Sequence, residues 1–221
     1  MGEEQLTEGQ RGRLRRELAQ IEPFRVLGRL IEVGPGRGWF LAEATRAGWK
    51  TCAVEVNAIA LEYLRSLGVT EIISETAERF TTEQETADVV RMWDVIEHLE
   101  SPKQAVVNIH RALRRGGLLR LATTNFASLS RWVNGPEWVY LNGADHIYLF
   151  EPPTIRRLLE AIGFRVLRIH TRSFNLRRKL YHPERVLPPP ISVLRLFRKI
   201  IDEAIKFTPY GHQMIVTAIK K

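Results

Sequence analysis

Hydrophobic and polar positions alternate in blocks along the chain, each short apolar run being followed by a turn and a segment with apolar residues at helical spacing. The apolar runs predict strands over residues 28–33, 51–56, 71–74, 87–93, 117–123, 165–171 and 213–219. The intervening segments predict helices over residues 39–47, 58–67, 102–114 and 154–162. This alternation is typical of an α/β domain with a parallel sheet.

Two segments lie outside this alternation. Residues 1–27 form an N-terminal segment in which residues 6–21 are predicted to be helical, because Leu14, Leu18 and Ile21 recur at helical spacing. We expect this helix to pack on the edge of the sheet or to cover a ligand. The main domain is then residues 28–221, with a helical insertion at about 174–211 before the last strand.

Composition favours one domain rather than two. The chain has 221 residues, 44% of them hydrophobic, which is enough for a single sizeable core. Its one cysteine, Cys52, has no partner for an intrachain disulfide. No apolar stretch is long enough to span a bilayer, and the charged N-terminus does not resemble a signal peptide. These features predict a cytoplasmic protein.

The positive charge is concentrated in the last third of the chain. Residues 1–150 carry 18 Lys and Arg against 20 Asp and Glu, whereas residues 151–221 carry 15 against 5. Residues 191–207 add an amphipathic, basic run. Such a region suits RNA or an anionic membrane surface, or it is a solvated face that packs on its own domain.

The clearest chemical signal is the glycine series that follows the first strand. Gly34, Gly36 and Gly38 lack a Cβ, so a ligand can approach the backbone of this turn closely. Their spacing differs from the Gly-x-Gly-x-x-Gly of dinucleotide-binding enzymes. Glu32, two residues before the turn, suits a ligand with an ammonium group, and Glu55, 21 residues beyond Gly34, suits the hydroxyls of a ribose.

Several segments together resemble the class I S-adenosylmethionine-dependent methyltransferases, in particular a bacterial small-molecule subgroup. They are Glu-Val-Gly-Pro-Gly-Arg-Gly at residues 32–38, Val-Glu-Val-Asn at 54–57, the run at 87–99, and Leu-Arg-Arg-Gly-Gly-Leu-Leu at 113–119. The resemblance implies a Rossmann-like sheet of seven strands, mostly parallel with an antiparallel last strand and helices on both faces. It also implies an enzyme that converts S-adenosylmethionine into S-adenosylhomocysteine.

The resemblance also implies the cofactor contacts. The methionine part is expected at Glu32 and the glycine turn, and the ribose at Glu55. The adenine is expected between Val56 on one face and Thr76 and Ala77 at its edge, and Trp93 and Asp94 are expected beside the methionine part. The full set of expected cofactor contacts is Glu32, Gly34, Gly36, Gly38, Glu55, Val56, Thr76, Ala77, Trp93 and Asp94.

The acceptor side is less determined. His98 and His146 are candidate general bases, because an imidazole changes charge near neutral pH. Trp132, Trp138 and Tyr140 cluster after the fifth predicted strand and form either an aromatic acceptor pocket or a cap over the core. We expect no metal site, because the histidines are scattered along the sequence.

The predicted function is methyl transfer to a small-molecule or lipid-like acceptor that the sequence does not identify. Two alternatives stay open: an RNA methyltransferase that uses the basic last third, and a protein that binds S-adenosylmethionine without turning it over. An NAD-dependent oxidoreductase is disfavoured by the glycine spacing. The oligomeric state is not predicted.

Overall fold

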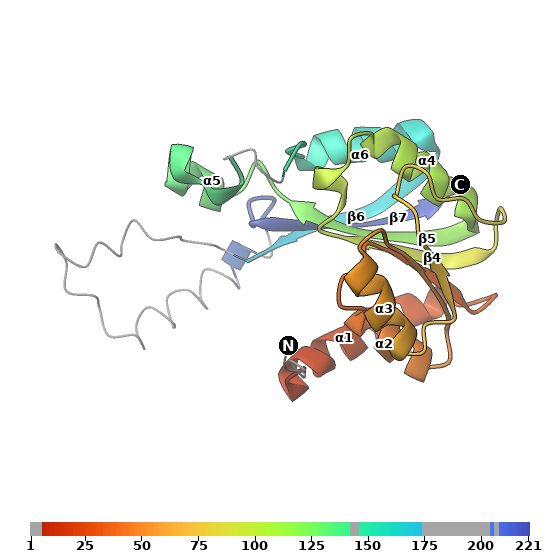
Figure 1. Cartoon of the computed structure of the whole chain (residues 1–221). Helices are drawn as coiled ribbons and strands as arrows, with labels where there is room; N and C mark the ends of the chain where they lie inside the picture. The colour runs from red at the N-terminus through yellow and green to blue at the C-terminus, as the bar shows by residue number, and fades with distance from the viewer. Residues whose placement is uncertain (1–5, 142–145, 174–203, 206–207) are drawn as a thin grey trace.

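The computed structural model describes residues 6–141, 146–173, 204–205 and 208–221. They form a seven-stranded sheet of order β3-β2-β1-β4-β5-β7-β6 (Figure 1). The strands are β1 (Arg29–Val33), β2 (Lys50–Val54), β3 (Glu71–Ile73), β4 (Ala87–Trp93), β5 (Leu113–Thr124), β6 (Phe164–Arg172) and β7 (Gln213–Lys220). Strands β1 to β5 pair in parallel, and β7 runs antiparallel to β5 and β6. The predicted fold class is confirmed.

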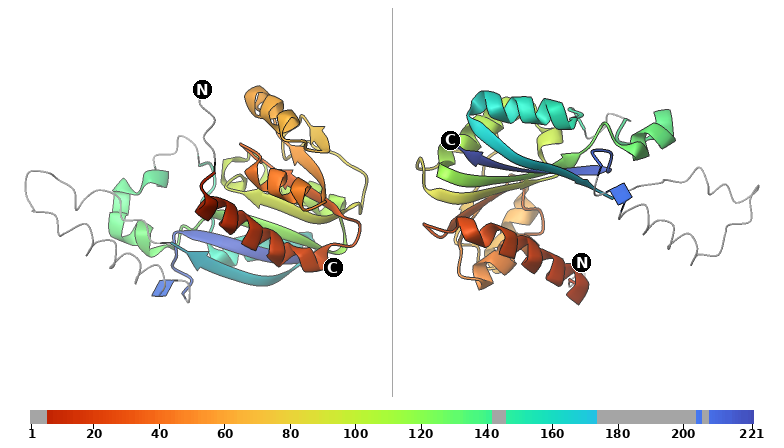
Figure 2. Two further views of the ribbon diagram at one scale, coloured as in Figure 1. Left: turned by 90° about the horizontal axis from the view of Figure 1, so that it is seen from below. Right: turned by 180° about the vertical axis from the view of Figure 1, so that it is seen from behind.

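Helices cover both faces of this sheet (Figures 1 and 2). One face carries α1 (Glu8–Ile21), α2 (Trp39–Arg46) and α3 (Ala58–Ser66), and the other carries α4 (Pro102–Ala112) and α6 (Pro152–Ile162). A sixth helix, α5 (Leu129–Asn134), follows β5, and short 3-10 helices span Glu22–Phe24, Ile96–His98, Gly135–Glu137 and Val139–Leu141. The sequence did not predict α5, because six residues are too few to show helical periodicity.

The helices that cover the sheet, α1 to α4 and α6, are attached by buried apolar side chains. Ile155 and Leu159 of α6 and Ile109 of α4 are completely buried in the core on one side of the sheet. Phe40 and Leu41 of α2 are buried on the other side. The spacing of Ile155 and Leu159 by four positions is what the helical pattern predicted.

The N-terminal helix α1 lies across a face of the sheet rather than along its edge (Figure 2). It begins with a capping box between Thr7 and Gln10. Leu18 and Ile21 are buried in the same cluster as Leu30 of β1. The expectation that α1 packs on the sheet edge is therefore corrected, since its apolar stripe meets the central strand.

The predicted insertion lies mostly outside the described residues, so the basic amphipathic helix at 191–207 stays a prediction. Ile205 is the described apolar residue of that run, and it is buried. Within the described ranges, no helix combines the length and apolar character that crossing a membrane requires.

A buried carboxylate joins the starts of the central strands. Asp88 is completely buried in β4. Its Oδ2 accepts hydrogen bonds from the backbone nitrogens of Leu27 and Gly28 at 2.8 and 2.6 Å, and its Oδ1 accepts one from Arg114 Nε at 2.6 Å. One side chain thereby fixes the entry into β1 and the early part of β5.

We expect Asp88→Ala to lower the free energy of unfolding by about 3 kcal/mol, because it leaves two backbone donors and a guanidinium without their buried acceptor. Denaturant titration measures the loss. The control is Glu160→Ala, which removes an exposed ion pair with Arg156 and should cost less than about 1 kcal/mol. Similar losses in the two variants would contradict this account of Asp88.

Candidate active site

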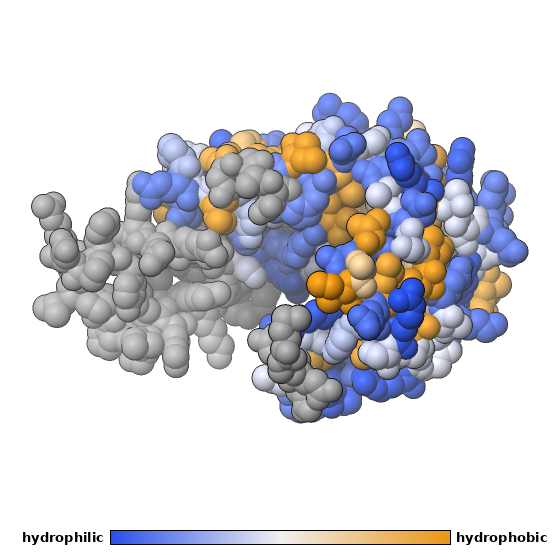
Figure 3. Space-filling view, in the orientation of Figure 1, coloured by the Kyte–Doolittle hydropathy of each residue, from blue (hydrophilic) through white to orange (hydrophobic). Residues whose placement is uncertain are grey.

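The candidate site lies at the carboxyl ends of the parallel strands, where ligands bind in open α/β sheets. Two cavities open there, with volumes of about 620 and 830 Å³. The smaller is lined by residues at and after the ends of β1 to β4, and in Figure 3 apolar side chains gather on the face of the molecule that carries α3. The larger lies between α1, the ends of β4 to β7 and the segment that precedes α6.

The glycine turn has the backbone that the sequence predicted. Gly34, Gly36 and Gly38 have φ angles of +66°, +54° and +66°. A Cβ at Gly34 would overlap the Val95 side chain, and one at Gly38 would overlap Leu64. A Cβ at Gly36 would meet nothing within 4 Å. Packing thus requires the outer two glycines, whereas Gly36 faces open space that a ligand can fill.

The smaller cavity brings together residues that follow the ends of four strands, β1 to β4. It is lined by Gly34, Glu55, Val56, Thr76, Ala77 and His98, among others. The Glu55 carboxylate accepts from the backbone nitrogens of Val56 and Asn57 at 2.8 and 2.9 Å, which holds it at the start of α3. The residues expected around the ribose and adenine therefore border one cavity, and their contact with a ligand stays a prediction.

The Glu32 side chain is buried and is not part of the wall of either cavity. It is 2% exposed, lines neither cavity, and its Oε1 is paired with Arg91 Nη1. Burial raises the pKa of Glu32 to about 7, although Arg91 opposes the shift. Arg91 itself lines the larger cavity, so it stands on the cavity side of Glu32. The sequence did not reveal this pairing, and Glu32 Oε2 has no hydrogen-bond partner among the described residues, so the contact of Glu32 with an ammonium group stays a prediction.

Trp93 and Asp94 both line the larger cavity, as expected for residues at the end of β4. The guanidinium of Arg91 lies 4.3 Å from the centroid of the Trp93 ring. Asp94 has a positive φ of 53°, and its Oδ1 accepts from Gln213 Nε2 at 2.7 Å. Burial raises the pKa of Asp94. Trp93 is thus contacted by a residue of its own strand, and Asp94 by a residue at the start of β7.

The two candidate bases meet at the junction of the cavities. His98 lines the smaller cavity and His146 the larger, and their ring centroids are 4.7 Å apart in an edge-to-face arrangement. Tyr140 stacks on His146 at 4.5 Å. Glu97 is 1% exposed, and neither carboxylate oxygen has a hydrogen-bond partner among the described residues. Burial raises the pKa of Glu97.

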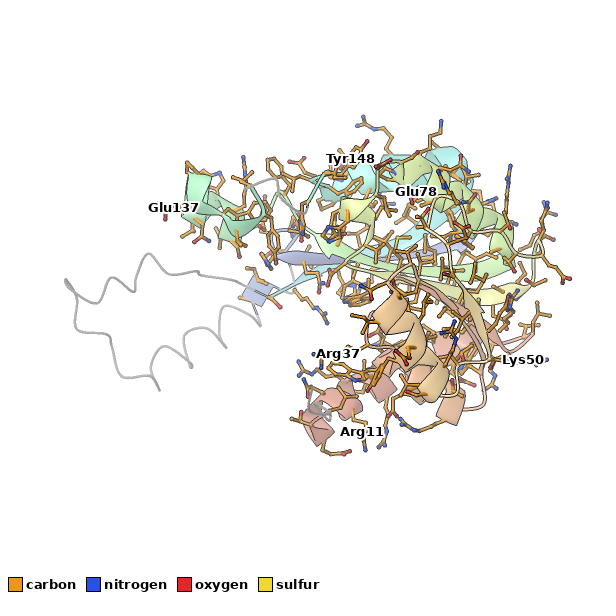
Figure 4. The ribbon with its side chains drawn as sticks, in the orientation of Figure 1. Arg11, Arg37, Lys50, Glu78, Glu137 and Tyr148 are labelled. Atoms are coloured by element: carbon orange, nitrogen blue, oxygen red, sulfur yellow. The ribbon has the colours of Figure 1, made fainter. Side chains whose placement is uncertain are left out.

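One backbone carbonyl brings these distant residues together. Glu97 O accepts from the backbone nitrogens of Ile147 and Tyr148 at 2.8 and 3.0 Å. The Tyr148 hydroxyl also donates to Glu100 O at 3.3 Å. Figure 4 shows Tyr148 on the same side of the sheet as Glu78. These bonds dock the segment after residue 145 beside the end of β4 and place His146 against His98.

His98 and His146 are far apart in the sequence, but the fold brings them together, so scattering along the sequence does not argue against a metal site here. Ligand atoms of Glu97, His98 and His146 all lie within 4.8 Å of one another. Two imidazoles and a carboxylate are a donor set that suits a divalent transition metal. The expectation that no metal is bound stays a prediction, since the same three groups also serve proton transfer.

The three aromatic residues of the predicted acceptor pocket have different environments. Tyr140 lines the larger cavity. Trp138 is 3% exposed and packs against Phe126 and Tyr140, so it caps the core. Trp132 is 80% exposed on α5 and lines neither cavity. Of the three, Tyr140 is the one that lines a cavity among the described residues, and contact of these rings with an acceptor stays a prediction.

Sequence reasoning missed three charged residues of the site, Glu17, Arg91 and Glu97. Arg91 carried a signal, since a charge amid the apolar residues of a central strand needs a buried partner. Glu97 directly precedes a candidate base, but its complete burial was not visible in the sequence. Glu17 looked like one of many charges on an exposed helix face.

The glycine turn yields a test of which residues serve packing and which serve a ligand. Gly38→Ala should destabilise the protein by about 2 to 3 kcal/mol, because its Cβ overlaps Leu64. Gly36→Ala should cost only about 1 kcal/mol of backbone strain but weaken S-adenosylhomocysteine binding at least tenfold. Denaturation and calorimetric titration measure the two effects, and unchanged affinity in Gly36→Ala would show that the ligand does not approach there.

Comparison with curated proteins gives two related sequences. Ubiquinone biosynthesis O-methyltransferase of Roseobacter denitrificans is 33% identical over 125 residues, which are 52% of this chain and 48% of that protein. The protein of the same name from a Chelativorans species is 26% identical over 159 residues, 67% of this chain and 62% of that protein. The chain therefore spans less than two thirds of the length of these relatives.

Solved structures share the fold. A SAM-dependent methyltransferase of Archaeoglobus fulgidus is 20% identical, with a TM-score of 0.65 over 95% of this chain and 92% of that one. A SAM-dependent methyltransferase of Thermotoga maritima, described as a possible histamine N-methyltransferase, is 20% identical with a TM-score of 0.65 over 96% and 90%. A family model described as a methyltransferase domain matches residues 6–169, more than half of the chain, and the chain belongs to this methyltransferase domain family.

Proposed function

We propose that the protein transfers a methyl group from S-adenosylmethionine to a hydroxyl oxygen of a small-molecule acceptor. The observation that carries this proposal is the contact between His98 and His146 at the junction of the two cavities. A hydroxyl acceptor must lose a proton as it attacks, and an imidazole is the side chain best suited to accept it near neutral pH. Both curated relatives are named as O-methyltransferases, which supports oxygen as the methylated atom.

The residues present fit the cofactor. The smaller cavity has a carboxylate, Glu55, for the ribose hydroxyls and an apolar wall at Val56 and Ala77 for the adenine. Gly36 leaves room for close approach of the ligand to the backbone. When bound, S-adenosylmethionine supplies an electrophilic methyl group on a sulfonium ion. The glycine turn and Trp93 are the residues that would hold its methionine part.

The larger cavity suits a compact acceptor with an aromatic or apolar body. Trp39, Trp93 and Tyr140 provide aromatic surface along its wall. His146 stacks on Tyr140, which restricts the rotation of the imidazole. Glu97, buried next to both histidines, stabilises the imidazolium that forms when the base takes the proton.

Most of the rate acceleration in this proposal comes from placement. Methyl transfer is an in-line displacement, so holding the two reactants in line contributes on the order of 7 to 11 kcal/mol. Proton removal by a histidine contributes roughly 10² to 10⁴-fold.

The alternative of RNA methylation is not favoured, because the named relatives act in the biosynthesis of a small molecule. The basic residues of the last third that would hold RNA lie partly outside the described ranges. A protein that binds S-adenosylmethionine without catalysis differs from an enzyme only in that it does not turn the cofactor over. Formation of S-adenosylhomocysteine from S-adenosylmethionine and a panel of phenols and catechols measures it.

We expect His146→Ala and His98→Ala to lower kcat, with the residue that acts as the base losing about 10² to 10⁴-fold. Affinity for S-adenosylhomocysteine should change less than about threefold in His146→Ala, since His146 lines the acceptor side. The control is His110→Ala, whose ring packs on Phe164 away from both cavities.

Two results would overturn the proposal. Full activity in both histidine variants would exclude an imidazole base. Tight binding of S-adenosylmethionine without turnover on any hydroxyl acceptor of the panel would favour the binding protein.

A further inference from the structure

One charged side chain of the larger cavity comes from the far edge of the sheet. Arg172 is the last residue of β6 and lines this cavity. Its guanidinium lies 5.3 Å from the centroid of the Trp93 ring at the end of β4, although β5 and β7 separate the two strands in the sheet. Among the described residues, its polar contact is a hydrogen bond to Gln213, and no carboxylate lies within ion-pair distance. The side chain therefore brings a positive charge into the cavity without a paired acid.

The backbone on both sides of Arg172 is fixed by hydrogen bonds. Thr171 is buried, and its Oγ1 accepts from Gly211 N at 2.9 Å. Ser173 O accepts from His212 N at 2.8 Å. Both bonds join the end of β6 to the segment that leads into β7. The backbone of Arg172 therefore has a defined place at the cavity wall.

Two hydrogen bonds in series set the direction of the guanidinium. Arg172 Nε donates to Gln213 Oε1 at 2.8 Å, and Gln213 Nε2 donates to Asp94 Oδ1 at 2.7 Å. Because an amide donates through its nitrogen and accepts through its oxygen, Asp94 orients the amide so that its oxygen faces Arg172. With Nε engaged, the remaining N–H donors of Arg172 are those on its two Nη atoms. No described residue accepts a hydrogen bond from this Nη edge.

The charges around Arg172 favour an anion at this edge. Burial lowers the pKa of Arg172, and the nearby charges of Arg13 and Arg91 act in the same direction. Glu17 and Asp94 oppose the shift, but neither forms an ion pair with Arg172. Since an arginine stays charged in proteins, an anion bound to the Nη atoms would offset both the lost hydration and the repulsion.

We infer that the methyl acceptor carries a carboxylate and that the Nη edge of Arg172 binds it. The planar guanidinium offers two parallel N–H donors that match the two oxygens of a carboxylate. Gln213 and Asp94 are positioning residues, which act through Arg172. The inference rests on the proposed function, because it names the chemical class of the acceptor in the same cavity.

An acceptor bound at Arg172 is close to the candidate base of the same cavity. His146 and Arg172 both line this cavity, and the charges of both lower the pKa of Asp94 against the effect of its burial. Trp93 and Tyr140 of the cavity wall supply surface for the body of the acceptor. The expected acceptor is therefore a compact aromatic hydroxy acid. Holding its carboxylate restricts the orientation of the ring and so of the reacting hydroxyl.

The test compares catechols that carry a carboxylate, attached to the ring directly or through one or two carbons, with the matching primary amides. Calorimetric titration measures the binding of each compound to the protein saturated with S-adenosylhomocysteine. For the unmodified protein, at least one acid should bind about tenfold more tightly than its amide, because the amide cannot form the charged pair with Arg172. In Arg172→Gln this preference should fall below about threefold, with the affinity for the amide little changed.

The matched control is Arg168→Gln, which removes the same charge from the same strand. Arg168 lies on β6 but lines neither cavity, so this variant should keep the preference for the acid. Arg172→Lys is a second variant, and an intermediate preference is expected because lysine keeps the charge but not the two parallel donors. The melting temperature checks that each variant is folded. Arg172→Gln should lose far less affinity for S-adenosylhomocysteine than for the acid.

The outcomes separate this inference from the proposed function. If the unmodified protein binds S-adenosylhomocysteine but shows no preference for any acid over its amide, the inference is overturned. A preference that survives in Arg172→Gln also overturns it, because another cation of the cavity, such as Arg13, would then hold the carboxylate. An equal loss of acid and S-adenosylhomocysteine affinity would place Arg172 at the cofactor and overturns it too. Failure of the unmodified protein to bind S-adenosylhomocysteine at all would refute the proposed function itself.

Discussion

The parallel pairing of β1 with β4 is the constraint on which the site depends. The register sets Glu32 directly opposite Arg91 inside the sheet, and two opposite charges there can be buried only as a pair. The same pairing ends both strands at one edge, so the glycine turn after β1 and Trp93 at the end of β4 open into neighbouring cavities. The pairing of β1 with β4 thus determines both how the charges of Glu32 and Arg91 are buried and which residues border the two cavities.

The site has two parts. One follows directly from the ends of the strands, and the other includes segments that lie outside the sheet. Glu55 and the glycine turn follow directly from β1 and β2, so their positions are fixed by backbone pairing. The larger cavity lies against the ends of β4 to β7, and the rest of its wall comes from α1, from Tyr140 and from the segment of His146, none of which belongs to a strand. Acceptor choice can therefore change through these elements without disturbing the adenosine side, which is how one fold hosts many activities.

The cluster of Glu97, His98 and His146 depends on contacts between segments far apart in the chain. The Glu97 carbonyl docks the segment after residue 145, and the edge-to-face contact of the two rings follows from that docking. The Glu97 carboxylate is buried, and neither of its oxygens has a hydrogen-bond partner among the described residues, a costly arrangement that is common where chemistry is performed.

The sequence by itself determined the strands, the helices over both faces and the glycine turn, because periodicity and missing Cβ atoms are local properties of the chain. Only the tertiary structure decided that Glu32 faces Arg91, that Trp132 points into solvent and Trp138 into the core, and that His146 meets His98. Each of these depends on which residues lie side by side across strands and loops. Strand order and docking of distant segments fix such neighbours, and neither is written in the local pattern of apolar and polar residues.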